Sequence, residues 1–370
     1  MQFAFTDEQN LIRETVFAAI GEAGERNRLY KVMESDGFDR EAWTLLTKEL
    51  MLGGAAYPEA YGGSGLGFVE LGSVQEALGR FLVPTPFLTS VIMSGMGILL
   101  CGTEDQKHMF LPDIISGEKV VAFAHSDTSG HFTHGTCPAQ LDGKNTLSGE
   151  VAMVQYGQFA DAFLVMAENP AGEIVLVMVE ANQEGVAITP KTSLDLTRPV
   201  AEVALHGVKV ASDNILSNGS ASVEKVLDIS RIMLAVEQMG AAEGALELAN
   251  VYAKDREQFG RPIGSFQAVK HRLADMMVML ESAKSAAWYA VCTAQEVEEE
   301  IPVAASTAAI VCARALSKNA AHGIQLHGGM GFTWECMAHL YFKRARTSSL
   351  ILGSPEMHRE KLADFVFTAV

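Results

Sequence analysis

Apolar side chains recur at helical spacing through the first part of the chain, beginning with Leu11, Val16 and Ile20. Thr6 precedes two acidic residues, which is typical of a helix start because a threonine side chain can cap the first amide groups. The helical pattern continues to about residue 117. This part of the chain is therefore predicted to be helical.

Two interruptions divide this helical region. One predicted helix begins at Asp39 and ends near Gly53 and Gly54. The glycine-rich segment 61–67 is predicted to be a loop, and it precedes a helix from Val69 to Leu82. Because this loop does not connect a strand to a helix, it is not a dinucleotide-binding fingerprint.

The pattern changes between residues 118 and 216. Short apolar runs rich in β-branched residues are separated by Gly, Asn, Asp and Pro at intervals of roughly ten residues, a spacing typical of all-β folds. The spacing favours a small antiparallel sandwich or barrel. The predicted strands are 120–124, 146–154, 162–167, 174–179, 186–189 and 201–205.

Helical periodicity returns in the rest of the chain, with alanine-rich faces that permit close packing in a four-helix bundle. The predicted helices are 222–255, 267–298, 303–327, 337–350 and 355–368. The predicted fold class is therefore mainly α with a central β-domain. Three domains are expected: an N-terminal helical domain (1–117), a β-sandwich or barrel (118–216) and a C-terminal four-helix bundle (217–370).

Composition narrows the possible functions. The 370 residues are enough for two or three packed units, and the 48% hydrophobic content excludes a disordered chain. A formal net charge of −17 without a basic run argues against a nucleic-acid partner or an anionic membrane surface. The five cysteines occur singly, so neither a disulfide framework nor a metal site is predicted. The N-terminal sequence has neither a signal-peptide pattern nor a long apolar stretch, so we expect a cytoplasmic protein without a membrane span.

Two segments are candidates for binding a large anionic ligand. The first reads Arg-Glu-Gln-Phe-Gly-Arg-Pro-Ile, in which the Arg256 guanidinium suits a phosphate and the Phe259 ring suits a planar base. The second reads Gln-Leu-His-Gly-Gly-Met-Gly-Phe-Thr-Trp-Glu from Gln325, and Gly328 and Gly329 permit close approach of backbone N–H groups to an anion. The alternatives are a surface ion-pair arginine, a core phenylalanine and a helix-ending glycine pair.

Together and in this order, the two segments resemble those of the acyl-CoA dehydrogenase flavoproteins, and the resemblance covers nearly the whole chain. Helices, then a β-domain, then helices is also the domain order of that family. The resemblance implies FAD, an acyl-CoA substrate and an oligomer, typically a tetramer, because these segments reach a neighbouring subunit's flavin in that family. The residues that it assigns to the cofactor are Arg256, Phe259, Gln267, Gln325, Gly328 and Gly329.

Arg231 matches a family arginine that lies beside the acyl-thioester pocket. The resemblance therefore assigns Arg231 to substrate binding. The alternative for an arginine near the start of a long helix is a solvent-exposed charge.

The resemblance fails at the catalytic base. In this family a glutamate removes the α-proton while the β-hydrogen leaves as hydride to the flavin. The position of that glutamate falls on Leu352, and the less common base position, immediately before Arg231, falls on Ser230. Because neither side chain is a base, the catalytic residue stays unassigned. Asp228 and Glu356 lie nearby in sequence and are predicted to be a cap or ion-pair acid and an exposed helix-start acid.

The β-region departs from the family as well. His125-Ser126-Asp127 and Thr128-Ser129-Gly130 stand where the family has Thr-Glu-Pro and Gly-Ser-Asp. Glu150, Met153 and Gln155 replace a basic residue, an aromatic residue and a threonine. The positions that hold a subunit's own flavin ring are therefore altered, whereas those that reach a neighbour's flavin are intact.

This asymmetry resembles a catalytically silent subunit that gives half of an FAD site to a glutamate-bearing partner. Such α₂β₂ acyl-CoA dehydrogenases serve some bacterial pathways of sterol and ring-compound degradation, and the segment 195–199, Asp-Leu-Thr-Arg-Pro, is common in those relatives. Three other interpretations stay open. They are an active homotetramer with a relocated base, flavin chemistry on a substrate other than a CoA thioester, and an assembly protein without flavin.

Overall fold

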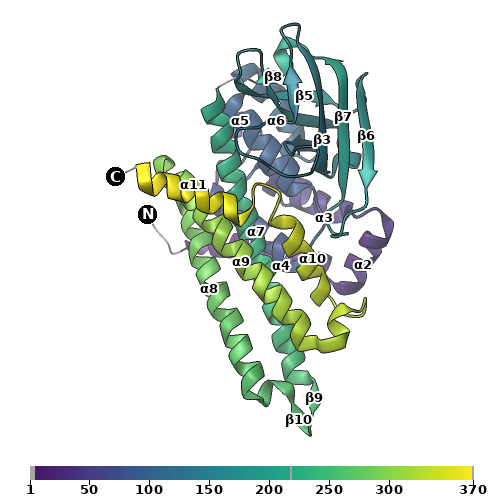
Figure 1. The fold of residues 1–370 in the computed structure, drawn as a ribbon, viewed down its shortest axis with the longest axis vertical. Coiled ribbons are helices and arrows are strands. Elements are labelled where there is room, and N and C mark those ends of the chain that lie inside the picture. Colours follow the sequence, from purple (N-terminus) through teal and green to yellow (C-terminus); the bar gives the residue numbers. More distant parts are fainter. Residues whose placement is uncertain (1–4, 217–218, 369–370) are drawn as a thin grey trace.

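Helices pack against a β-sheet, and the C-terminal helices extend away from it as a long bundle (Figure 1). The computed structural model describes residues 5–216 and 219–368. The predicted fold class, mainly α with a central β-domain, is confirmed. The N-terminal helices are α1 (Asp7–Ala23), α2 (Arg26–Ser35), α3 (Arg40–Thr44), α4 (Phe68–Phe81), α5 (Gly95–Cys101) and α6 (Glu104–Ile115).

Side-chain hydrogen bonds form N-caps at the helix starts that the sequence indicates. Thr6 and Gln9 form a reciprocal capping box at the start of α1. The Asp39 carboxylate accepts the N–H of Ala42 at 2.9 Å and caps α3. The α-helix predicted to continue from there is wrong beyond α3, because the chain goes on as a π-helix (Leu45–Glu49) and Met51 then adopts a left-handed conformation with φ of 52°.

The described residues form one eight-stranded sheet, apart from a short hairpin, with the order β6-β7-β3-β2-β4-β5-β8 and β1 beside β4. The expected antiparallel arrangement is wrong in part, because β4 runs parallel to both β1 and β2. Two strands went unpredicted because they are only two and three residues long. The strands are β1 (Val121–Ala124), β2 (Ala139–Leu141), β3 (Thr146–Gln155), β4 (Ala162–Glu168), β5 (Ile174–Glu180), β6 (Val186–Lys191), β7 (Val200–Lys209) and β8 (Ile215–Leu216).

Both faces of the central strands are buried, which explains their continuous apolar sequences. In β4, Leu164 belongs to the core shared with the helices, whereas its neighbour Phe163 belongs to a second core inside the β-domain. A π-helix, Leu88–Ser94, lies against β1. The hydroxyls of Thr89 and Ser90 accept the N–H groups of Phe123 and Val121 at 2.9 and 3.0 Å, so the backbone of this strand is covered rather than exposed.

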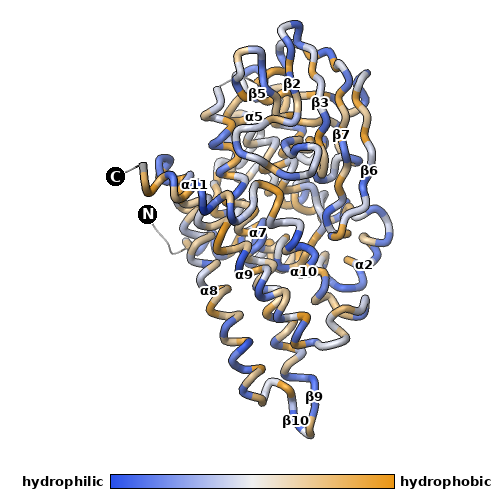
Figure 2. Tube along the Cα trace, in the orientation of Figure 1, coloured by the Kyte–Doolittle hydropathy of each residue, from blue (hydrophilic) through white to orange (hydrophobic). Residues whose placement is uncertain are grey.

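The C-terminal helices are α7 (Ser220–Asp255), α8 (Gln267–Glu296), α9 (Ile301–His327), α10 (Ala338–Ser348) and α11 (Pro355–Thr368). The first three pack side by side and extend away from the sheet to a hairpin of β9 (Glu257–Gln258) and β10 (Arg261–Pro262) (Figure 1). Hydrophobic and hydrophilic positions alternate along α8, as expected for a helix with one packed face (Figure 2). We call this end of the bundle the tip.

One segment, Glu298–Phe332, is long and apolar enough to cross a membrane by length and composition alone. It contains α9. Half of its most apolar window is buried inside the fold, and the core helix of a soluble protein passes the same test. The apolar character of this segment is therefore accounted for by its packing against α7 and α8.

A buried network of four charges joins the β-domain to the bundle. Arg344 of α10 contacts Asp195 and Glu237 at 2.7 Å each, and Arg198 pairs with the same Glu237. Arg198 also donates to the Ser348 hydroxyl at 3.0 Å. Burial alone would raise the pKa of Asp195, but Arg344 and Arg198 outweigh it and hold the pKa below its usual value. The segment before β7 is thereby fixed to α7 and α10.

Removing one carboxylate from this network should cost far more than removing an exposed one. Glu237→Ala leaves two buried guanidinium groups without their shared partner, and we expect it to lower the free energy of unfolding by about 3–5 kcal/mol. Glu247→Ala is the matched control on the same helix. Glu247 pairs with Arg80 at 2.8 Å but is 55% exposed, so its loss should cost at most about 1 kcal/mol. Equal losses in urea unfolding would contradict this account of the network.

Candidate functional site

A cavity of about 220 Å³ lies between the β-domain and the segment that follows α10. It occupies the place where the sequence comparison puts the ring of a subunit's own flavin. Among the residues that the structure describes, no carboxylate lines it. Its lining comes from the end of β1, from β3, from the segment before β7 and from the end of α10: His125, Ser126, Gly130, Met153, Gln155, Ser193, Leu194, Arg198, Val200, Arg346, Thr347, Leu350 and Ile351.

Several polar groups of this cavity are already bound to other parts of the protein. His125 Nε2 lies 2.7 Å from the Ile351 carbonyl oxygen, and the Ser126 hydroxyl donates to the Ala152 carbonyl. Burial, reinforced by Arg231, lowers the pKa of His125 and favours the neutral imidazole. These contacts engage His125 Nε2 and the Ser126 hydroxyl inside the protein, whereas His125 Nδ1 has no partner among the described residues.

Met153 narrows the same cavity. Its backbone φ of 55° is unusual for a residue other than glycine, and a register shift in the pairing of β3 with β7 occurs at this point. Its side chain lies over Gly130, where a Cβ would come within 2.6 Å of Met153 Cγ. With Met153 here and with His125 and Ser126 engaged, the residues present do not complete a site for a flavin ring.

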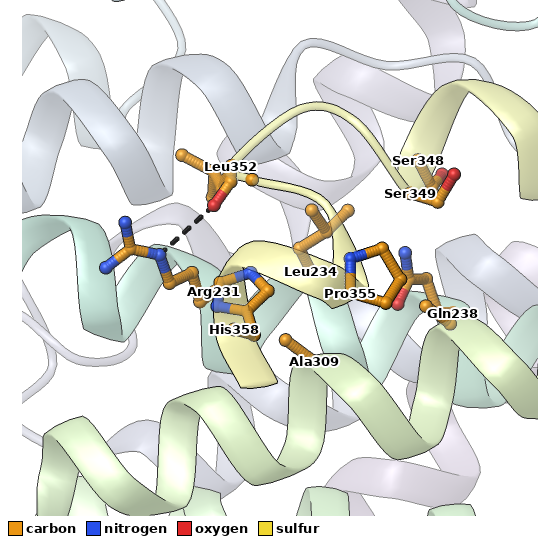
Figure 3. A pocket seen from close by; sticks show the side chains of 11 residues that line it. Arg231, Leu234, Gln238, Ala309, Ser348, Ser349, Leu352, Pro355 and His358 are labelled. Carbon is orange, nitrogen blue, oxygen red and sulfur yellow. Dashed lines mark hydrogen bonds between the residues drawn. The ribbon is translucent and has the colours of Figure 1, made fainter. Parts of the chain in front are cut away.

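Leu352, at the position of the family's glutamate, is buried. Its side chain is 1% exposed, and its carbonyl oxygen accepts the Arg231 Nε–H at 3.2 Å (Figure 3). A cavity that touches both residues has a volume of only about 10 Å³, which is room for about one water molecule. This cavity is too small for a thioester.

Arg231 lies inside the protein, so the alternative of a solvent-exposed charge is wrong. It is 1% exposed and pairs with Asp228 at 2.6 Å. Its guanidinium carbon lies 5.3 Å from the centre of the Phe132 ring, and Lys361 of α11 contacts the same Asp228 at 2.9 Å. Arg231 and Asp228 thus form a buried ion pair, with one guanidinium nitrogen, Nη2, left without a hydrogen-bond partner among the described residues.

The other candidates for a base are poorly prepared for proton abstraction. The Ser230 hydroxyl donates to the Val226 carbonyl of its own helix at 2.7 Å. Glu356 is exposed at the start of α11 and pairs with Arg359 at 2.9 Å, as expected of a helix-start acid. Its own backbone N–H and Arg359 lower the pKa of Glu356, which makes the carboxylate a weaker base.

The six residues assigned to the cofactor by resemblance gather at the tip of the bundle, and we call them the six tip residues. All of them are exposed, and Phe259 is 92% exposed, so the alternative of a core phenylalanine is wrong. Gly328 ends α9 with φ of 60°, and a Cβ at Gly328 or Gly329 would meet nothing within 4 Å. The six tip residues are Arg256, Phe259, Gln267, Gln325, Gly328 and Gly329.

The tip lies at the far end of the bundle, whereas the ring cavity lies where the β-domain meets the end of α10. Arg231, beside Leu352, lies in the first third of α7, and Arg256, at the tip, directly follows the helix. At 1.5 Å per residue, they are separated by about 38 Å along the helix axis. Within one chain, the six tip residues and the ring cavity cannot contact the same cofactor molecule.

Some residues around the base position were not found from the sequence. Phe132 and Lys361 surround Arg231, and His358 lines the small cavity beside Leu352. They come from a loop after β1 and from α11, and no local pattern marks them. Only the packing of distant segments brings them together.

Comparison with known proteins identifies the family of this chain. The family models for the N-terminal and C-terminal domains of acyl-CoA dehydrogenases match residues 6–118 and 217–367. The acyl-CoA dehydrogenase IpdE2 of Mycolicibacterium smegmatis is 30% identical over 98% of this chain and 100% of its own length. The chain belongs to the acyl-CoA dehydrogenase family.

Two solved structures of this family show the same fold. The ChsE4-ChsE5 complex from Mycobacterium tuberculosis contains a chain with a TM-score of 0.91 and 28% identity, and the match covers 99% of each chain. A variant of the steroid acyl-CoA dehydrogenase Tcur3481-Tcur3483 gives a TM-score of 0.88 and 30% identity over 98% of each chain. Acyl-CoA dehydrogenases depend on FAD. The tip, with open glycines and an Arg256 side chain that has no ion pair among the described residues, fits the pyrophosphate and adenine part of that cofactor.

The buried His358 should make the protein acid-sensitive. Burial, reinforced by Arg231 and Lys361, lowers the pKa of His358 to about 4. Between about pH 6.5 and pH 4, the unfolded chain takes up a proton that the folded chain refuses, so stability falls as the pH falls. Between pH 7 and pH 4.5, we expect the free energy of unfolding to fall by about 2–3 kcal/mol less in His358→Gln than in the wild type. Urea unfolding at each pH measures this. Parallel pH profiles for the two proteins would show that this histidine is not responsible.

Proposed function

We propose that this chain is a catalytically silent subunit of a heteromeric, FAD-dependent acyl-CoA dehydrogenase. Its partner would be a related chain that carries the catalytic glutamate, in an assembly of the tetramer class. The observation that carries this proposal is Leu352, a buried leucine at the position of the base, beside a cavity of water size.

The retained tip residues support the same conclusion. Arg256, Gln325 and the glycine pair lie on an exposed surface and do not pack in the core. Folding alone therefore does not explain their presence, whereas cofactor binding does. When bound, FAD accepts the hydride, and the partner's glutamate would accept the α-proton. Our proposal gives this chain two tasks: to hold the pyrophosphate and adenine half of the partner's cofactor, and to complete the assembly.

The relatives suggest the substrate class. ChsE4-ChsE5 and Tcur3481-Tcur3483 are each named as assemblies of two different chains, and the second is named a steroid acyl-CoA dehydrogenase. We therefore propose an acyl-CoA thioester derived from a sterol or fatty acid as the substrate of the whole assembly. All five cysteines are free in the structure, which suits a reducing compartment, and we propose a cytoplasmic location.

The isolated chain should be inactive. Without a carboxylate at residue 352 or residue 230, we expect the chain purified alone to give no flavin reduction on mixing with short, long or sterol-derived acyl-CoA thioesters. Absorbance at the flavin bands, recorded in a stopped-flow instrument, measures this directly. The loss of a positioned base typically costs about 10²–10⁴ in rate. Rapid bleaching of a flavin by the chain alone would reject the silent-subunit proposal, and Asp228 and Glu356 would then be the first residues to replace.

Restoring the acid should not restore activity. Leu352→Glu supplies a carboxylate, but it leaves Met153, His125 and Gln155 in the ring cavity and no space for a thioester. We expect this variant, assayed without its partner, to remain inactive. Turnover by the single variant would mean that the missing base alone silences the chain.

The tip should matter to flavin binding in the assembly. We expect Arg256→Ala to weaken FAD retention by the complex of the two chains about tenfold or more, because a charge-assisted phosphate contact is lost. Lys254→Ala is the matched control, since it removes an exposed cation two residues earlier in α7. FAD dissociation constants of the deflavinated complex, measured by flavin fluorescence, distinguish the two variants. Equal retention by both would argue that the tip does not reach the cofactor.

A further inference from the structure

The six tip residues come from two arms that are distant in sequence. Arg256 follows α7 directly and leads into the β9–β10 hairpin, whereas Gly328 follows α9 directly. A cofactor that contacts both arms requires a fixed spacing between the ends of these two helices. The question is which contact sets that spacing.

One pair of side chains joins the two arms. Tyr252 lies in the last turn of α7, and its carbonyl oxygen accepts the Arg256 N–H at 2.9 Å. His327 is the last residue of α9 and immediately precedes Gly328. The two rings are stacked, with centroids 4.2 Å apart and an angle of 26° between their planes.

Each ring is oriented by a further contact. His327 Nδ1 lies 2.7 Å from the Gly323 carbonyl oxygen one turn earlier in α9. The Tyr252 hydroxyl approaches Met330 Sδ at 3.9 Å, in the segment that follows the glycine pair. His327 is only 6% exposed, so the stack is packed from the inner side while the glycines beside it stay open.

We propose that Tyr252 and His327 are positioning residues that hold the Arg256 arm and the glycine arm in register for FAD. This inference rests on the proposed function of the tip. Neither ring needs to touch the cofactor. Since the stack joins the residue before Gly328 to the last turn of α7, its loss loosens the spacing of the two arms at the tip and weakens a ligand that contacts both.

Substitutions at Tyr252 separate the stack from the hydroxyl contact. In the assembly that carries flavin, we expect Tyr252→Leu to raise the FAD dissociation constant about fivefold to tenfold, the loss expected for an aromatic pair. Tyr252→Phe keeps the ring and loses only the weak contact with Met330, so FAD binding should stay within about twofold of the wild type. The matched control is Tyr289→Leu, which removes a partly exposed tyrosine from α8, away from the tip.

A second variant tests coupling. His327→Ala should weaken FAD binding as much as Tyr252→Leu, and the double variant should be no weaker than either single variant, because each substitution destroys the same contact. Thermal unfolding of the flavin-free assembly and its subunit stoichiometry give the readouts that a purely structural role would change. We expect both to remain close to the wild type. If Tyr252→Leu does not assemble, His327→Ala carries the same test.

The outcomes distinguish this inference from the proposed function. If Arg256→Ala weakens FAD binding but Tyr252→Leu does not, the positioning role is wrong and the function of the tip stands. If Tyr252→Phe is as damaging as Tyr252→Leu, the stack is not the operative contact and the inference is wrong. If neither Arg256→Ala nor Tyr252→Leu changes FAD binding, the proposed function of the tip itself fails.

Discussion

The arrangement of this molecule depends on the buried charges that join its β-domain to its bundle. Asp195 and Arg198 belong to the β-domain, whereas Glu237 and Arg344 belong to two bundle helices, and the pairs Arg344–Asp195 and Arg198–Glu237 join the two halves. Their formal charges cancel, which is the condition for burying them. The segment that carries Leu352 follows α10 directly and is therefore placed by this contact.

Helix α7 connects the region of this buried charge network to the tip. The first half of the helix lies among the buried groups around Arg231, and its C-terminal end leads into the exposed arm of Arg256. Nearly every residue between Val226 and Ala245 is buried, so the helix cannot adjust one end to suit the other. The two regions are separate chemical environments, one buried and one exposed.

Much of this organisation was predictable from the sequence. The helices and the longer strands follow directly from the period of apolar residues, because burial of one face or of both faces leaves a repeating signal. The parallel pairing of β4 with β1 and β2 was not predictable, since the period within a strand contains no information about its neighbours' direction. The surroundings of Arg231 were not predictable either, because Phe132, and Lys361 on its partner Asp228, come from other elements. The assignment of residue 352 to the family's base position rests on the resemblance and stays a prediction.

The separation of Arg231 from Arg256 along α7 has an evolutionary consequence. Substitutions around residue 352 lie about 38 Å from the tip and share no contact with it. After a gene duplication, one copy can therefore drift at its catalytic end while selection continues to preserve its other end for the sake of its paralogue. Regaining catalytic activity would require more substitutions than losing it. In the assembly that we propose, a reverting lineage would have to regain an acid, a thioester-sized space and several ring contacts together, so reversion would require several changes at once.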